Sequence, residues 1–431
     1  MYYYCATSQK STSIWHSIVC SFTGPNDRNF VLAKGNHLEV HLLCEDSIVP
    51  IVDAPLFGKI STIDCYRHQG ENVDSLFLLL ESKHFFVLKW DPVNKKLVAK
   101  ATGNVRDRVG RDFESGHLSL IDPQYRLIAM ILSEGMIKIL PIEGLAFKEA
   151  YNVRLDVNRF LDIKFLHGCA KPTLCMLYED PRRYRHIRTF VVDLREKELI
   201  QGPWSQSNVE HGANTIIAVP SPTNGIIIIG ETTITYLNGQ GNVQSTAINP
   251  TKMGAWGVID NDGTRFLLGD LHGTLYVLLL VKSENVVVSI VVEYVGVSSI
   301  AQSINYLDNG VVYIGSAFGD SQLIKLRATP DENGSFIDVL ESYPNIGPIT
   351  DMCVVRTEKQ GQSQIVTCSG AFKDGSLRII RSGIGLYIQA AMEIHGIKGM
   401  WSLRQSENDV YDKFLVQSFI GETRILAIEN E

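Results

Sequence analysis

Four side chains near the middle of the sequence carry the donor atoms of a zinc site: His167, Cys169, Cys175 and His186. Zinc sites built from cysteine and histidine usually hold their ligands in closely spaced pairs. The spacing here fits no zinc motif, and the four residues fall on both sides of predicted strands. We therefore expect buried cysteines and ordinary loop histidines at these positions, and no metal ion.

The same region has a compact basic segment, 182–188 (RRYRHIR), with a tyrosine inside it. Arginines interleaved with an aromatic residue are the composition that a phosphate or nucleic-acid site needs. However, Glu179 and Asp180 precede the segment closely, and the chain has a formal net charge of -7. That charge disfavours general attraction to phosphate backbones. A solvated hairpin turn is the favoured interpretation.

The sequence has none of the standard signatures of phosphate-binding loops, dinucleotide folds, zinc proteases, serine hydrolases or dithiol redox sites. Four aspartates lie in or beside turns rich in glycine and asparagine: Asp260, Asp262, Asp270 and Asp320. Aspartate is favoured in such turns because its carboxylate bonds to nearby backbone N–H groups. We interpret all four as turn residues, and we expect a protein that is not an enzyme and has no cofactor.

The elements that would position any site follow one repeated pattern. Each repeat predicts a hairpin. It begins with several β-forming residues, continues with a polar or glycine-containing turn, and ends with a second run that has apolar residues at alternate positions. The hairpins start at Phe30, Phe77, Leu127, Leu174, Ile226, Phe266, Val311, Ile365 and Phe414. Successive starts are 40 to 54 residues apart, with further strands between the hairpins. Convincing helices are nearly absent.

A period of about 40 to 50 residues with four strands in each period is typical of β-propeller blades. Seven of the hairpins start before residue 330, and seven blades can close a ring. The sequence therefore predicts an all-β protein with a seven-bladed β-propeller, in which a strand at 2–7 completes a blade begun at the other end. The last two hairpins are surplus to this ring. Because the chain stops directly after the ninth, we expect a fragment or a truncated gene product.

Composition favours a folded protein of the nucleus or cytoplasm. The chain is 45% hydrophobic and 20% charged. Its eight cysteines are too sparse for a disulfide scaffold, so we expect reduced and mostly buried thiols. The apolar runs are far shorter than the ~20 residues of a membrane helix, and the first residues lack a secretory signal pattern. We assign four tryptophans to blade packing: Trp90, Trp204, Trp256 and Trp401.

Two hairpin turns place an aromatic residue at the tip: Phe318 in GSAFGDSQ and Phe372 in SGAFKDGS. Tip residues gain nothing from core burial, so exposed rings on one rim of a propeller would form the kind of patch that marks protein contacts. The alternative is that both rings fold back onto the blade surface. The sequence leaves these two interpretations equal.

Long runs of the sequence closely resemble the damaged DNA-binding protein 1 family. The longest are LDNGVVYIGSAFGDSQLIKL (307–326), GPITDMCVV (347–355), QIVTCSGAFKDGSLRIIRSGIG (364–385) and GIKGMWSL (396–403). Shorter runs, among them GNVRDRVGR (103–111) and LREKELIQGPW (194–204), extend the resemblance along the whole chain. The large propeller subunits of the cleavage and polyadenylation factor and of a splicing complex share this architecture.

The resemblance implies a protein of three propellers, in which the first and third form a cleft for substrate receptors and the second holds the cullin-4 scaffold of a ubiquitin ligase. Residues 1–350 are then the first β-propeller, and 351–390 are connecting strands that help to build the third. Residues 391–431 are the opening blade of a second, truncated β-propeller. The implied function is a non-enzymatic adaptor of a cullin-4 RING E3 ubiquitin ligase, in DNA damage repair and protein ubiquitination. Because most of the second propeller is absent, cullin-4 binding is doubtful for this chain.

The resemblance also implies a receptor-binding cleft, which receptors enter with a helical motif. Its residues are Phe318, Pro348, Ile349, Ala371 and Phe372. Ala317 stands where family members tend to carry arginine, and Phe318 where they carry leucine, so this surface stays apolar and loses a charge. DNA is expected to be contacted only through receptors. Two alternatives stay open: an RNA-processing scaffold subunit, and a propeller enzyme with a site in the central channel.

Overall fold

The computed structural model describes residues 9–44, 47–68, 70–107, 110–113, 116–144, 146–155, 157, 159–356, 363–381, 393–407, 409 and 411–427. The chain divides into two compact units, Met1–Ile380 and Arg381–Glu431. Among the described residues the only helical element is the 3-10 turn η1 (Phe372–Asp374). No helix in this part of the chain is long and apolar enough to cross a membrane.

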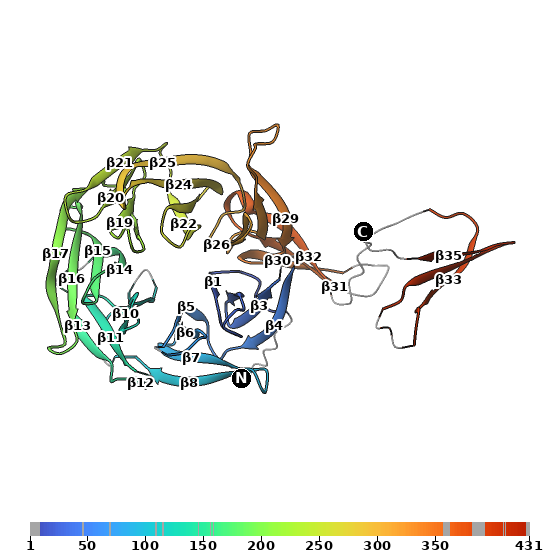
Figure 1. The fold of residues 1–431 in the computed structure, drawn as a ribbon, viewed down its shortest axis with the longest axis horizontal. Coiled ribbons are helices and arrows are strands. Elements are labelled where there is room, and N and C mark those ends of the chain that lie inside the picture. Colours follow the sequence, from blue (N-terminus) through green and yellow to red (C-terminus); the bar gives the residue numbers. More distant parts are fainter. Residues whose placement is uncertain are drawn as a thin grey trace. The chain divides into compact units, whose positions relative to one another are not determined.

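The described residues of the first unit form seven antiparallel sheets arranged in a ring (Figure 1). The first two blades contain β1 (His16–Cys20), β2 (Asn29–Lys34), β3 (His37–Leu43), β4 (Ile48–Pro55), and β5 (Ile60–Tyr66), β6 (Ser75–Leu80), β7 (His84–Asp91), β8 (Lys96–Asn104). The third contains β9 (Leu118–Ile121), β10 (Leu127–Ser133), β11 (Met136–Glu143), β12 (Ala146–Phe147) and β13 (Tyr151–Arg154). The fourth contains β14 (Phe160–Phe165), β15 (Thr173–Glu179), β16 (Arg185–Asp193) and β17 (Glu198–Val209).

The last three blades of the ring repeat the same four-stranded plan. They contain β18 (Thr215–Ala218), β19 (Ile226–Ile229), β20 (Thr233–Leu237), β21 (Val243–Ala247), then β22 (Met253–Val258), β23 (Arg265–Asp270), β24 (Thr274–Ser283), β25 (Val286–Val297), and finally β26 (Ser303–Asp308), β27 (Val311–Gly315), β28 (Ser321–Leu326), β29 (Ile337–Tyr343). A three-stranded sheet of β30 (Ile349–Arg356), β31 (Ser363–Ser369) and β32 (Ser376–Ile380) completes the first unit. The second unit contains the three-stranded sheet β33 (Ile397–Leu403), β34 (Phe414–Phe419) and β35 (Thr423–Ala427).

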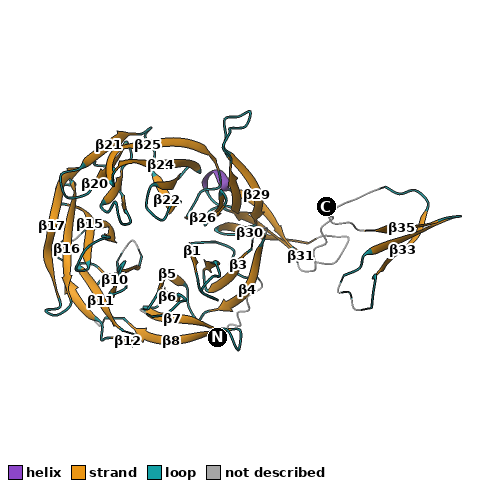
Figure 2. Cartoon of the chain, in the orientation of Figure 1, coloured by secondary structure: helices purple, strands orange, loops and turns teal. Residues whose placement is uncertain are grey.

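Each propeller blade is built from strands that are consecutive in the sequence, as the hairpin repeat predicts. The first strands β1, β5, β22 and β26 lie inside the ring (Figure 2), and β1 contacts both β5 and β26. The second strands are the most buried, and β6 and β10 are buried at every residue. They read as continuous apolar runs because both of their faces pack against neighbouring blades. The seven-bladed all-β fold is therefore confirmed.

Hydrophobic clusters lie between the blades and hold the ring together. In one of them Val31 and Leu38 of the first blade pack with Leu76 and Leu78 of the second. Each blade covers the apolar face of the next blade in this way. Because the ring closes, no apolar face between blades is left uncovered.

The ring closes between the first and seventh blades by packing and by loop hydrogen bonds. Ile14 and Phe30 cluster with Tyr313 of the seventh blade, and the Ile14 N–H donates to the Ser316 carbonyl over 3.1 Å. The seventh sheet already has four strands from consecutive sequence, so its described strands need no strand from the other end of the chain. The strand predicted at 2–7 lies outside the described residues.

Two predictions about buried side chains need correction. All seven described cysteines are free, but only Cys20 and Cys175 are buried, and Cys44, Cys353 and Cys368 are exposed. Trp401, assigned from the sequence to blade packing, is 57% exposed on β33. Cys353 lies on β30, where every residue is exposed. Alternation along a strand indicates that the strand exists, but it does not show whether another sheet covers it.

Candidate docking surface

The five residues of the predicted cleft come from three separate segments, and the structure brings these segments together. Phe318 lies in the turn between β27 and β28. Pro348 directly precedes β30, and Ile349 is its first residue. Ala371 and Phe372 lie in the turn between β31 and β32. The Ala371 N–H donates to the Phe318 carbonyl over 2.9 Å, and the Gly370 N–H donates to the Pro348 carbonyl over 2.9 Å. Backbone hydrogen bonds therefore join all three segments. We call Phe318, Pro348, Ile349, Ala371 and Phe372 the docking surface.

Gly370 makes this junction possible. Its φ of +81° lies in the region that favours glycine. A Cβ atom here would lie 2.4 Å from the Asp374 carbonyl oxygen and 2.7 Å from the Phe318 carbonyl oxygen. Both are backbone atoms that cannot rotate away, so only glycine lets the β31–β32 turn approach the β27–β28 turn this closely.

Asn345 fixes the loop before β30 and is itself 1% exposed. Its Nδ2 group donates to the Gly319 carbonyl over 3.0 Å. Its Oδ1 atom accepts hydrogen bonds from the hydroxyl groups of Thr12 and Ser13 at 2.8 and 3.0 Å. One buried amide therefore ties the N-terminal segment, the β27–β28 turn and the loop that carries Pro348. Sequence reasoning missed this residue, because an asparagine between two strands looks like any turn residue.

The two tip phenylalanines differ in exposure. Phe372 is 81% exposed, and its φ of +55° lies in the left-handed region. Phe318 is half-buried and lies between two other rings: its centroid is 6.4 Å from that of Trp15 and 5.7 Å from that of Phe372. Ile349 is 49% exposed. The docking surface therefore exposes the side chains of Phe372 and Ile349, next to a Phe318 ring that is partly buried.

The charged groups around the docking surface are paired or hydrogen-bonded. Arg378 and Asp320 form an ion pair at 2.6 Å. The Asp374 carboxylate accepts the Ile300 N–H over 2.8 Å, and the Lys373 ammonium donates to the Ser298 carbonyl over 2.6 Å. No catalytic pair faces the surface among these groups, and its chemistry is that of an apolar contact with a charged rim.

A hollow of about 810 Å³ lies in the central channel of the ring. The first strands of the first, second, sixth and seventh blades line it, and Trp15, His16 and Asp64 are among the lining residues. Burial raises the pKa of Asp64 to about 6, against the opposing effects of the Cys65 N–H and Lys164. Burial also lowers the pKa of His16. The described residues contain no group of three or more side chains that could hold a metal ion.

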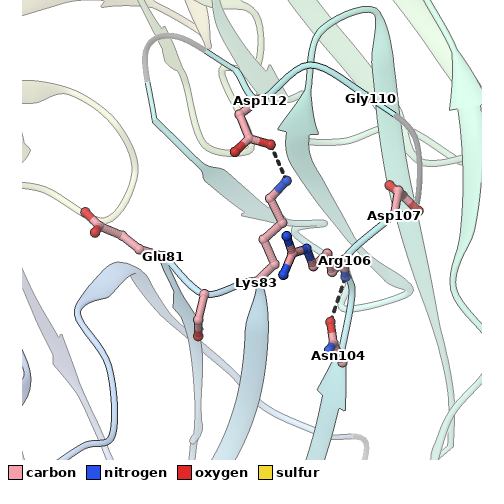
Figure 3. A pocket seen from close by; sticks show the side chains of 8 residues that line it. Glu81, Lys83, Asn104, Arg106, Asp107, Gly110 and Asp112 are labelled. Carbon is pink, nitrogen blue, oxygen red and sulfur yellow. Dashed lines mark hydrogen bonds and ion pairs between the residues drawn. The ribbon is translucent and has the colours of Figure 1, made fainter.

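A second hollow of about 550 Å³ lies where the β6–β7 turn meets the segment after β8 (Figure 3). Lys83 points between Asp112 and Arg106 in this hollow and forms an ion pair with Asp112. Asp107 accepts hydrogen bonds from Lys138 at 2.7 Å and from Asn152 at 3.0 Å. The hydrogen bond from Lys83 holds the pKa of Asp112 below its usual value. These carboxylates are thus stabilised in the ionised form, which does not suit a general acid at neutral pH.

The other sequence candidates are structural. Asp180 accepts the N–H groups of Arg182 and Tyr184 at 2.9 and 2.8 Å, which makes the basic segment a hairpin turn. His186 pairs with Asp180 at 3.4 Å rather than with the proposed cysteines, and burial raises the pKa of Cys175 well above its usual range. The turn interpretation is confirmed for Asp262 and Asp270, whose carboxylates accept backbone N–H groups two to four residues away. The Asp260 carbonyl oxygen accepts the Gly263 N–H, while its carboxylate pairs with Arg265. The Asp320 carboxylate instead accepts the N–H of Asn345, which is distant in sequence.

Trp15 is the second residue that sequence reasoning missed. It follows Ile14 of the ring-closing segment and directly precedes β1, and it is 38% exposed. No hairpin pattern includes it, and its partner Phe318 is distant in sequence, so only the closed ring brings the two rings together. It extends the docking surface toward the mouth of the central channel.

Comparison with known proteins places these observations in a family. The family described as the RSE1/DDB1/CPSF1 first beta-propeller matches residues 13–360. The chain is 49% identical over 429 residues to the DNA damage-binding protein 1 of Oryza sativa subsp. japonica, covering 99% of this chain and 39% of the relative. It is 47% identical, with the same coverage, to DNA damage-binding protein 1 of Solanum lycopersicum and to DNA damage-binding protein 1a of Arabidopsis thaliana. The chain thus spans about two fifths of the length of these relatives.

Proposed function

This chain belongs to the RSE1/DDB1/CPSF1 first-propeller family, and from that premise we propose that it is a non-enzymatic adaptor that docks substrate-receptor proteins of a cullin-4 RING ubiquitin ligase. The processes are DNA damage repair and protein ubiquitination, in the nucleus and the cytoplasm. DNA is contacted through the receptors. The cullin-4 scaffold is a partner of the full-length protein, and this chain supplies the receptor-facing propeller.

One observation carries the proposal: three segments that are far apart in sequence converge on a single apolar surface. Phe372 and Ile349 are exposed there although exposure of apolar side chains gains nothing for folding. The loops beneath them are fixed by buried hydrogen bonds of Asn345. A rigid base with exposed apolar groups is the arrangement expected of a binding surface, because little conformational entropy is lost when a partner docks.

The chemistry of the surface favours an amphipathic helix as the receptor element. A helix presents apolar side chains on one face at spacings of three and four residues. The exposed rings and the Ile349 side chain supply apolar contacts for such a face. The paired charges at the rim leave the solvent-facing side of the helix free to be polar.

The two alternatives receive less support. The enzyme alternative places its site in the central channel, where the described lining contains a single carboxylate, Asp64, and a single histidine, His16. In the second hollow, the carboxylates Asp107 and Asp112 are engaged by cations. The RNA-processing alternative is compatible with the same family, whose description also names RSE1 and CPSF1. However, five relatives that match almost the whole chain at 46 to 49% identity carry the name DNA damage-binding protein 1, 1a or 1b.

Calorimetric titration of the full chain with the docking helix of a cullin-4 substrate receptor tests the proposal. We expect Ile349→Asp to weaken binding by roughly thirtyfold or more, the usual effect of losing a buried anchor. Val243→Asp is the matched control, because Val243 is also an exposed apolar strand residue but lies on β21 of the fifth blade. Equal affinity of both variants for the helix would contradict the proposal.

Affinity purification of the full-length protein from nuclear extract separates the remaining alternatives. Recovery of cullin-4 together with its receptors, with the receptors but not cullin-4 lost in the Ile349→Asp variant, supports the ligase adaptor. Recovery of polyadenylation or splicing factors in place of cullin-4 would favour the RNA-processing scaffold.

A further inference from the structure

Trp15 adds a third aromatic ring to the docking surface. The Phe318 ring contacts both the Trp15 ring and the Phe372 ring, and we call these three rings the aromatic ladder. We propose that the aromatic ladder selects receptor helices that carry large apolar side chains on three successive turns. The inference rests on the proposed function, because it defines the class of helix that the same surface binds.

The spacing of the rings matches the pitch of a helix. The centroids of Trp15 and Phe318 are 6.4 Å apart, and those of Phe318 and Phe372 are 5.7 Å apart. An α-helix rises about 5.4 Å in each turn. A helix that lies along the aromatic ladder therefore places one side chain per turn against one ring. Apolar residues at positions i, i+4 and i+7 would contact the three rings in order.

Trp15 is held in place before any partner binds. The N–H of Ile14 donates to the Ser316 carbonyl, and the Trp15 N–H donates to the Ala33 carbonyl at 3.4 Å. These bonds fix the backbone between the first and seventh blades. The indole is nevertheless 38% exposed, and its edge-to-face contact with Phe318 orients it. A fixed, partly exposed tryptophan is the residue type that most often anchors a protein interface.

Lysines flank both ends of the aromatic ladder and indicate the polar character of the partner. The Lys59 ammonium lies 5.7 Å from the centroid of the Trp15 ring, and Lys373 follows Phe372 directly. Lys59 pairs with Glu81, but both side chains are 52% exposed, so water screens that pair. The Lys373 ammonium donates to the Ser298 carbonyl, so its partner in this contact is not a carboxylate. Charge complementarity therefore favours a helix with acidic residues beside its apolar stripe.

Selection from a displayed library of helical peptides, with positions i, i+4 and i+7 randomised, tests this inference on the full chain. Wild-type protein should enrich large apolar residues at all three positions. The Trp15→Ala variant should leave the position that faces residue 15 unselected, and should bind the three-anchor peptide at least about tenfold more weakly. A peptide with serine at that position should bind wild type and Trp15→Ala within about twofold of each other. Trp15→Phe should restore selection at the position that faces residue 15.

The outcomes separate this inference from the proposed function. If Trp15→Ala enriches the same three apolar positions as wild type, Trp15 is not an anchor and the inference is overturned, while docking at Phe372 and Ile349 stands. If wild-type protein enriches no helix, or if Ile349→Asp leaves enrichment intact, the proposed function fails and the inference fails with it. Thermal unfolding of Trp15→Ala and Trp15→Phe, measured alongside, identifies any loss of binding that comes from unfolding.

Discussion

The ring of Phe318 meets the ring of Phe372 edge to face, with centroids 5.7 Å apart and planes inclined at 76°. The contact joins the seventh blade to the three-stranded sheet that follows it. The two rings contribute unequally, because Phe372 is 81% exposed whereas Phe318 also packs against Trp15. Binding and stability should therefore respond differently to substitution at the two positions.

Phe372→Asp should weaken receptor-helix binding by about 2 to 4 kcal/mol, because it removes an anchor and places a carboxylate against apolar surface. Its free energy of unfolding should stay within about 0.5 kcal/mol of wild type, as for other exposed positions. Phe318→Asp should lower both the affinity for the receptor helix and the free energy of unfolding, since the Phe318 ring is half-buried. Calorimetric titration and urea unfolding of both variants check this. An equal loss of stability in the two would show that Phe372 is also a packing residue.

Gly370→Ala should distort the junction of the docking surface. The added methyl group would lie within 2.7 Å of two backbone carbonyl oxygens, and the residue has a φ of +81°. Left-handed backbone alone costs an alanine about 1 to 2 kcal/mol, so the free energy of unfolding should fall by at least that much, with weaker helix binding.

Gly375→Ala is the matched control in the same turn. Gly375 has a φ of -63°, and an added Cβ atom would meet only the Phe372 carbonyl oxygen, at 3.4 Å. Urea unfolding of this variant should be close to wild type. The explanation fails if Gly370→Ala unfolds at the same urea concentration as Gly375→Ala.

The sequence predicts the blades well because each is a local meander whose hairpins carry their own pattern. It also places Phe318 and Phe372 at turns. It does not predict Trp15 or Asn345, because their roles depend on contacts across the closed ring that leave no periodic signal. The exposure of Cys353 was missed for a related reason, since burial of a strand depends on whether another sheet covers it.

Glu210 joins the fourth and fifth blades, and its removal should loosen them. Its carboxylate accepts backbone N–H bonds from Glu231, Thr232 and Thr233 and hydroxyl bonds from both threonines, at 2.6 to 3.0 Å. Glu210→Gln replaces one accepting oxygen with an NH₂ donor that faces other donors. We expect a loss of about 2 kcal/mol in the free energy of unfolding at pH 7. Glu231→Gln in the same turn, whose side chain is exposed, should be neutral.

The loss of stability in Glu210→Gln should become smaller at low pH. Burial raises the pKa of Glu210, but the hydrogen bonds from Thr233 and Thr232 outweigh it, so the folded pKa lies below 4.5. A carboxyl group with a lowered folded pKa stabilises the protein above its unfolded pKa and loses that contribution as pH falls through the folded value. The difference between wild type and Glu210→Gln should shrink below about pH 4. A difference that is constant from pH 7 to pH 3.5 would contradict the assignment to the ionised carboxylate.

Asp64 should show the opposite dependence on pH. Its carboxyl group lines the central channel, and burial raises its pKa from 3.8 to about 6 even though the Cys65 N–H donates to it. Between these two values the folded protein binds more protons than the unfolded chain, so the contribution of Asp64 to stability falls as pH rises from about 4 to 6.

Asp64→Asn removes this ionisation and keeps the shape and one accepting oxygen of the side chain. The variant should therefore be more stable than wild type at pH 7.5, by no more than about 3 kcal/mol, since each unit of pKa shift corresponds to about 1.4 kcal/mol. Near pH 4 the two proteins should unfold at nearly the same urea concentration, because Asp64 is then mostly protonated when folded. Urea unfolding at both pH values makes this comparison without altering any residue of the docking surface. A variant less stable than wild type at pH 7.5 would contradict this prediction. It would mean that the ionised Asp64 carboxylate is stabilised in the fold, with Lys164 as the cation that lowers the pKa of Asp64.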